Sequence, residues 1–86
     1  MAEEKEVGVV FKFFAKPGVA AVRVMAEGFK VGDKLAYRGN TTDFEDTVQR
    51  IEINNQAVPE AKPGDMVGVK VAERVRPNDK VYKLVD

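Results

Sequence analysis

The sequence contains no cysteine, no histidine, no tryptophan and no serine. Without cysteine and histidine it has no disulfides, no zinc-finger ligands, no thiolate nucleophile and no imidazole for acid–base catalysis. The absence of serine excludes the common acyl-enzyme nucleophile as well. Catalysis would have to rest on carboxylates, amines, tyrosine or threonine, and we expect that the chain is not an enzyme.

Long apolar runs are also missing, since none approaches the ~18 residues of a membrane-spanning helix. Residues 1–6 are acidic and lack the apolar stretch of a signal peptide. Lys plus Arg number 14 and Asp plus Glu number 14, so the formal charge is zero, which argues against a protein devoted to gripping a nucleic-acid backbone. The charged fraction of 33% fits a thermophile's surface. We predict a soluble, cytoplasmic protein that does not contact membranes.

What the chain does contain is valine, with 15 copies against 2 each of leucine and isoleucine. A β-branched residue suits the pleated surface of a sheet better than a helix. The 86 residues are enough for one small domain, which we place at residues 6–86 behind a flexible tail at residues 1–5. The composition therefore predicts a single β domain.

Turn signals divide the chain into short segments. Residues 16–18 read Lys-Pro-Gly, and residues 54–55 are an Asn-Asn pair. Three further segments, residues 31–35, 63–67 and 77–81, place Asp directly after Gly or Asn. We predict that each of these three is a turn that delivers the chain into a new strand.

Between the turns, apolar residues alternate with polar ones as in half-buried strands. The predicted strands are residues 6–14, 18–25, 33–38, 44–53, 65–72 and 80–85. We expect an all-β, six-stranded closed antiparallel barrel, because closure removes the exposed edges of so valine-rich a chain.

Two details of the alternation bear on the core. Phe11 and Phe13 share the parity of Val7, so we expect them to fill the core, whereas Phe14 points the other way. Within residues 44–53 the apolar parity changes, and a β-bulge near residues 49–50 would restore an inward face.

Three stretches in order, residues 18–24, 29–35 and 64–69, resemble domain II of translational GTPases such as elongation factor Tu and initiation factor 2. The likeness covers residues 7–85 and is nearest to small standalone archaeal elongation-factor-like proteins; a similar barrel is appended to some collagenase-like peptidases. The resemblance implies a translation-type barrel that helps to contact aminoacyl-tRNA or ribosomal RNA. The phosphate-binding loop G-x-x-x-x-G-K-[ST] is missing, so we expect no GTP binding by this chain alone. Met25 also stands where the factors carry an acidic residue.

Basic residues of the first three predicted strands and the first turn form the candidate binding site, if those strands are neighbours. The candidate residues are Lys12, Phe14, Lys16, Arg23, Lys34 and Arg38. Long cations would contact phosphates of ribosomal RNA or tRNA while the aromatic ring stacks on a base. The alternative is a solvated barrel exterior. An exposed Phe14 beside Met25 and Met66 would instead form an apolar patch for a protein partner.

The carboxylates of Asp43, Glu45 and Asp46 are the densest acidic cluster, and Mg²⁺ or Ca²⁺ prefers such oxygen ligands. We expect strand alternation to direct Glu45 away from the other two, and we predict no metal and no cofactor. The leading hypothesis is therefore a non-enzymatic, translation- or RNA-associated adaptor whose partner is ribosomal RNA, tRNA or a translation factor. The alternative is a protein–protein interaction module acting in trans for a larger enzyme.

Overall fold

The computed structural model describes residues 3–85, which form strands and turns without any helix. The strands are β1 (Glu3–Phe14), β2 (Val19–Val24), β3 (Phe29–Lys30), β4 (Lys34–Arg38), β5 (Asp43–Thr47), β6 (Ile51–Ile53), β7 (Gln56–Val58), β8 (Glu60–Ala61), β9 (Met66–Lys70) and β10 (Lys80–Val85). The all-β prediction is confirmed, and each predicted strand has a counterpart. Residues 3–85 accordingly offer no helix long and apolar enough to cross a bilayer.

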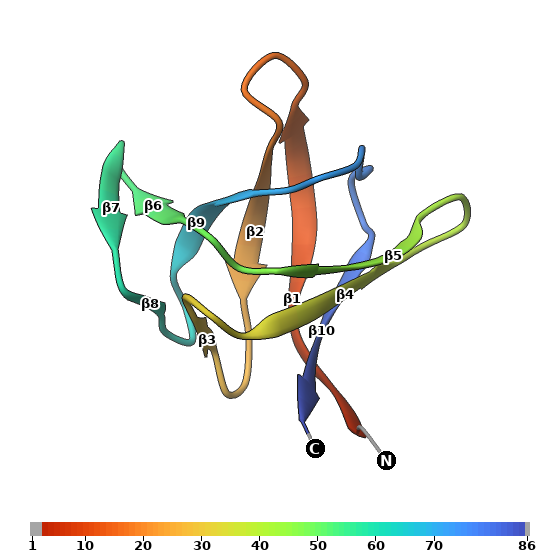
Figure 1. Ribbon diagram of the computed structural model, residues 1–86, viewed down its shortest axis with the longest axis horizontal. Coiled ribbons are helices and arrows are strands. Elements are labelled where there is room, and N and C mark those ends of the chain that lie inside the picture. The colour runs from red at the N-terminus through yellow and green to blue at the C-terminus, as the bar shows by residue number, and fades with distance from the viewer. Residues whose placement is uncertain (1–2, 86) are drawn as a thin grey trace.

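The strands form one large antiparallel sheet in the order β5-β4-β10-β1-β2-β9-β6-β7 and a small sheet in which β3 pairs with β8. Figure 1 shows β4 and β5 running across the direction of β1 and β2. The first and last described residues lie at the same side of the molecule, since Glu3 pairs with Val85. The pairing order has two ends, β5 and β7, so the predicted closure into a six-stranded barrel is not confirmed.

Strands near both ends of the large sheet nevertheless contribute residues to the same core. Leu35 and Tyr37 of β4 and Ile51 of β6 are all buried in one hydrophobic cluster. Because β4 and β6 lie near opposite ends of the pairing order, the sheet must curve so that both ends cover the same core.

The first strand begins earlier than the sequence indicated. Residues 3–5, which were predicted to belong to a flexible tail, are paired in β1 with β10, where Lys5 lies opposite Lys83. The remainder of that predicted tail, Met1 and Ala2, lies outside the described residues.

Two register shifts interrupt the alternation of β1, one between Glu6 and Gly8 and one between Val10 and Lys12. A bulge adds one residue and so reverses which side chains face the core beyond it. Val10 is therefore buried, whereas Phe11 is 47% exposed. The prediction that Phe11 fills the core was wrong, while Phe13 packs partly buried against it.

The parity change near residues 49–50 is resolved by a gap rather than a bulge within one strand. The chain leaves the ladder after β5 and re-enters it at β6, and Val48 and Ile51 on either side of residues 49–50 are both buried. The Val48 N–H donates to the carbonyl of Asp33 at 2.8 Å, which anchors this crossing segment. The irregularity lies at the predicted position, near residues 49–50, but it is a break between two strands and not a β-bulge.

The three Asp-containing turns, residues 30–33, 62–65 and 76–79, share one hydrogen-bond pattern. In each, the Asp N–H donates to the carbonyl three residues earlier at 3.0–3.1 Å, and the Asp carboxylate accepts the N–H of that same residue at 2.8–3.0 Å. The third residue has a positive φ, 98° at Gly32 and 78° at Asn78, which is typical of a type II turn. The predicted turns are confirmed, and this double contact explains why Asp follows Gly or Asn each time.

Candidate functional site

A surface pocket of about 470 Å³ opens on the side of β1, β2 and β9 that faces away from the core. Its floor is made of small side chains and its walls of large apolar ones, and we call it the trough. The trough residues are Phe11, Phe14, Pro17, Val19, Ala21, Glu52, Asn54, Asn55, Met66, Val67 and Gly68.

The floor is low because small residues from two paired strands meet there. Ala21 of β2 lies opposite Gly68 of β9 in the register, and Val19 is two residues before Ala21. A Cβ added at Gly68 would stand 3.1 Å from Val19 Cγ1, so even one methyl group would crowd the floor. The choice of Gly at this position keeps the trough open.

The walls are exposed apolar side chains. Phe11, Phe14 and Met66 are 47%, 43% and 57% exposed. Phe11 reaches this side because the register shift between Glu6 and Gly8 turns Val10, the residue before it, toward the core. Isolated apolar residues on a surface are ordinary, but several gathered around a depression are typical of an interaction site. Met25 is also 43% exposed, yet it does not line the trough.

One end of the trough carries amide groups from the β6–β7 hairpin. Asn54 and Asn55 form its two-residue loop with φ values of 52° and 65°, as a type I′ turn requires. This confirms the predicted Asn-Asn turn and places donors and acceptors beside an apolar floor.

Cations surround the apolar walls. The Lys12 ammonium lies 5.0 Å from the centroid of the Phe14 ring, Arg23 is opposite Met66 in the register, and Lys70 Nζ donates to the Pro17 carbonyl at 2.6 Å. Within residues 3–85, none of these three cations forms an ion pair with a carboxylate. The acidic trough residue is Glu52, whose carboxylate is 2.5 Å from Arg50 Nε.

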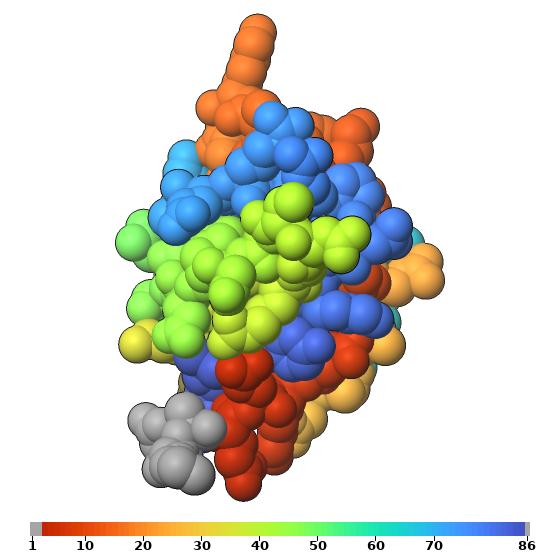
Figure 2. Space-filling model, turned by 90° about the vertical axis from the view of Figure 1, so that its right-hand side faces the viewer, coloured from red at the N-terminus to blue at the C-terminus, as the bar shows by residue number. Residues whose placement is uncertain are grey.

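The structure brings three of the predicted site residues together and separates the others. Lys12, Phe14 and Arg23 border the trough, and Lys16 is exposed in the β1–β2 turn, which projects from the molecule in Figure 2. Lys34 and Arg38 lie on β4, which is separated from β1 by β10. The condition that the first three predicted strands are neighbours was wrong, because the last strand of the chain inserts between them.

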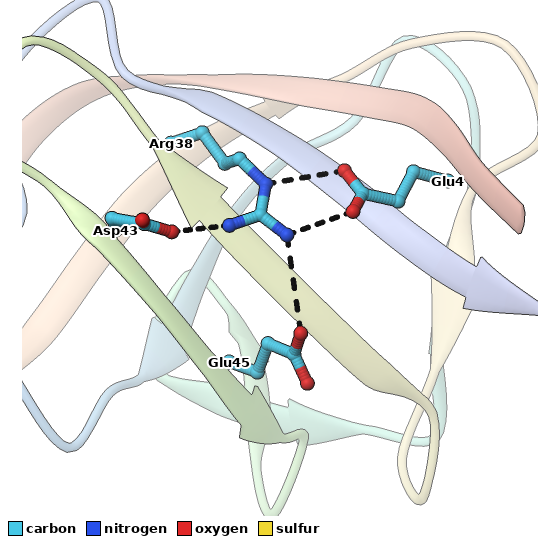
Figure 3. Close-up of polar contacts among 4 residues, drawn as sticks. All are labelled: Glu4, Arg38, Asp43 and Glu45. Carbon is cyan, nitrogen blue, oxygen red and sulfur yellow. Dashed lines mark hydrogen bonds and ion pairs between the residues drawn. The ribbon is translucent and has the colours of Figure 1, made fainter. Parts of the chain in front are cut away.

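Arg38 is held by three carboxylates, as Figure 3 shows. Its Nε and Nη2 donate to the two oxygens of Glu4 at 3.1 and 2.7 Å, Nη1 donates to Asp43, and Nη2 is 3.9 Å from Glu45. The hydrogen bond from Arg38 holds the pKa of Glu4 below its usual range, and the same contact raises the pKa of Arg38. In this Arg38 cluster the positive charge is already offset, which leaves little attraction for a phosphate.

The acidic cluster differs from the expectation. Asp43 and Glu45 lie on the same face of β5, where both contact Arg38, and it is Asp46 that points away. The Asp46 carboxylate accepts the Ala72 N–H at 3.0 Å. Across residues 3–85, no group of three or more metal-binding side chains is placed to hold an ion.

No protein-family model matches the chain. Among curated proteins, an uncharacterized protease of Methanocaldococcus jannaschii is 39% identical over 80 residues, which cover 92% of this chain and 19% of the protease. A collagenase of Porphyromonas gingivalis is 33% identical over 79 residues, covering 91% of this chain and 22% of the collagenase. The chain thus spans about a fifth of the length of these relatives.

The fold is that of a known domain. The C-terminal domain of a Geobacillus thermoleovorans protein described as a U32 peptidase superposes with a TM-score of 0.85 at 22% identity, covering 92% of this chain and 91% of that domain. A selenomethionine form of the same domain gives a TM-score of 0.83. The fold is therefore the one found at the C-terminus of that protein.

These relatives overturn the resemblance to translation factors. The matched proteins are a protease, collagenases and a C-terminal peptidase domain, not domain II of a translational GTPase. The segments Gly-Asp-x-Val-Gly and Val-Gly-Asp that suggested the resemblance include two of the Asp turns, which serve to start strands. The prediction of a translation- or RNA-associated adaptor was wrong, and the alternative, an interaction module for a larger enzyme, agrees better with the relatives.

Proposed function

We propose that the chain is a non-catalytic interaction module that docks through the trough onto the remainder of a peptidase-type enzyme, in cis or in trans. The observation that carries this proposal is the gathering of Phe11, Phe14 and Met66 around a floor of small residues. Exposed aromatic and methionine side chains around a recess supply the desolvated anchors of protein interfaces.

The lengths of the relatives support the choice of partner. The chain corresponds to about a fifth of proteins named protease or collagenase, so each of these carries a larger portion that the chain does not cover. We infer that this remaining portion is what the trough docks against. The trough is an apolar recess of the described residues that offers a surface for such docking.

We also infer that the large sheet closes into the six-stranded barrel expected from the sequence. Support comes from backbone hydrogen bonds of residues 48–50, which lie between β5 and β6. Gly32 N–H donates to the Val48 carbonyl at 2.9 Å, next to the β4–β5 pairing, and Lys70 N–H donates to the Arg50 carbonyl at 3.4 Å, next to the β6–β9 pairing. Residues 43–53 thus run from β4 to β9, which are the two sides that closure must join. Closure of this kind would leave the trough on a rigid exterior.

The proposal is tested with a chimera in which this chain replaces the matching 80 residues of the Methanocaldococcus jannaschii protease. Amide hydrogen exchange is measured for peptides that cover the trough strands, in the chimera and in the isolated chain. We expect residues 11–21 and 66–68 to exchange at least about tenfold more slowly in the chimera, because docking excludes water from the trough.

Two methionines provide a matched control. Met66→Ala in the chimera should abolish the added protection, whereas Met25→Ala, which truncates an equally exposed methionine outside the trough, should leave it intact. Equal exchange in the chimera and the isolated chain, or protection that Met66→Ala and Met25→Ala affect alike, would overturn the proposal.

A further inference from the structure

We propose that the trough recognises an extended peptide segment in which a few apolar residues are flanked by carboxylates. This inference rests on the proposed function for the location of the site and adds the chemistry of the segment bound there. Three features carry it: the cations around the trough, the width of its floor, and the amides at its end.

The charge around the trough is positive although the chain as a whole is neutral. Lys12, Arg23 and Lys70 stand at its border without a carboxylate partner among residues 3–85, and Glu52 is paired with Arg50. Charges around an interface are complementary to those of the partner and repel partners of the wrong sign. Acidic residues on either side of an apolar segment satisfy this requirement, and lysines there would be repelled.

The dimensions of the floor suit a short extended segment. The trough extends across β1, β2, β9 and β6, which are successive neighbours in the sheet. Neighbouring strands lie about 4.8 Å apart, so four strands span about 14 Å, or about four residues of an extended chain. The floor at Val19, Ala21 and Gly68 offers apolar contact over this length.

The polar groups favour a peptide over a nucleic acid. The amides of Asn54 and Asn55 can donate to and accept from a peptide backbone at the end of the trough. The Lys12 ammonium, 5.0 Å from the ring centroid, covers one face of Phe14 and so removes that face from base stacking.

The test uses the full chain and two capped, fluorescein-labelled peptides in fluorescence anisotropy titrations at low salt. Both peptides carry Leu-Pro-Leu-Val at the centre; one has two Asp at each end and the other has two Lys. We expect the acidic peptide to bind at least about tenfold more tightly, and its affinity to fall as salt screens the cations.

Variants assign the effect to the trough. Arg23→Glu should weaken the acidic peptide at least about fivefold and improve the lysine peptide, whereas Arg74→Glu, at an exposed position outside the trough, should change neither. Met66→Ala should weaken the acidic peptide without altering the preference between the two.

The outcomes separate this inference from the proposed function. Equal affinity for both peptides, no binding of either, or an Arg23→Glu variant that behaves like Arg74→Glu would overturn the inference, and the exchange protection in the chimera would still stand. Loss of that protection together with intact acid-selective peptide binding would overturn the docking proposal instead. Displacement of the peptide by an oligouridylate in an Arg23-dependent manner would assign the trough to nucleic acid and also overturn the inference.

Discussion

Two outward-facing surfaces of the same sheet use cations in opposite ways. At the Arg38 cluster, one guanidinium from β4 is surrounded by the carboxylates of Glu4, Asp43 and Glu45. At the trough, Lys12 and Arg23 have no carboxylate partner among the described residues and stand beside exposed apolar side chains. The first arrangement pairs its charges within the described residues, and the second leaves its cations free for the partner that we propose.

Net charge is therefore a poor guide to the charge of any one surface of a small protein. The equal totals of 14 cations and 14 acids argue against a charged binding face. The fold distributes these charges unevenly. β10 lies between β4 and β1 and so separates the β4 cations from the trough, and β1 places Glu4 beside Arg38. A neutral chain thereby has one self-neutralised surface and one positive surface.

The largest contrast should be in stability when an aromatic residue near each surface is truncated. Tyr37 beneath the Arg38 cluster is 1% exposed and stacks on Phe44 with ring centroids 4.9 Å apart. We expect Tyr37→Ala to lower the free energy of unfolding by about 3–5 kcal/mol through the cavity it leaves. Phe14→Ala at the trough should change it by no more than about 0.5 kcal/mol. Urea unfolding followed by circular dichroism measures both, and similar losses would remove the distinction between a structural and a recognition surface.

The same buried tyrosine should make the protein less stable at alkaline pH. Burial, with a smaller contribution from Asp46, raises the pKa of the Tyr37 hydroxyl. A raised pKa means that the stability contribution is complete below the unfolded value of about 10 and is lost as pH rises above it, by up to about 1.4 kcal/mol per pH unit. Tyr37→Phe should flatten this part of the curve relative to the native chain. Parallel curves for the two proteins between about pH 9 and 11 would contradict the assignment.

Local features of the fold were predictable because they depend on neighbours in the sequence. The strand at residues 80–85 and the Asp turns follow from alternation and from the positive φ that Gly or Asn accepts. The register shift between Glu6 and Gly8 was not predictable, because it depends on how β1 matches β10 in register. One added residue was enough to turn Phe11 from the expected core to the surface.

The candidate site was predictable in part for the same reason. Parity alone indicated that Phe14 faces away from the core, and the hypothesis of an apolar patch joined it to Met25 and Met66, of which only Met66 lines the trough with it. The floor at Ala21 and Gly68 was missed, since small residues are visible as a recess only when β2 and β9 are known to pair. The exclusion of Arg38 from the candidate site could not be predicted either, because it depends on the contact with Glu4, which is 34 residues away in the sequence.

Removing one cation from each surface should have smaller effects, and the effects should differ in kind. At the Arg38 cluster stability should fall, and at the trough the affinity for a peptide should fall. Arg38→Met leaves Glu4, Asp43 and Glu45 close together without their counter-ion, and we expect a loss of about 1 kcal/mol in the free energy of unfolding. Added salt should reduce that loss. Arg23→Met should change stability by less than about 0.5 kcal/mol and lower affinity for an acidic peptide. If Arg23→Met proved the more destabilising of the two, the division of roles between the surfaces would be wrong.

The smallest effect should come from acid, and it should again be confined to the Arg38 cluster. Hydrogen bonding to Arg38 lowers the pKa of Glu4, and the guanidinium keeps its charge at every pH at which the protein is folded. A lowered pKa means that the contribution is complete above the unfolded value of about 4.3 and is lost as pH falls through the folded value. Glu4→Gln should therefore narrow its difference from the native chain as pH falls from about 7 to 3, as measured by urea midpoints. Arg23→Met, which removes a cation without a carboxylate partner among the described residues, should run parallel to the native chain over the same interval. A Glu4→Gln difference that does not depend on pH would mean that its carboxylate contributes packing rather than charge to the cluster.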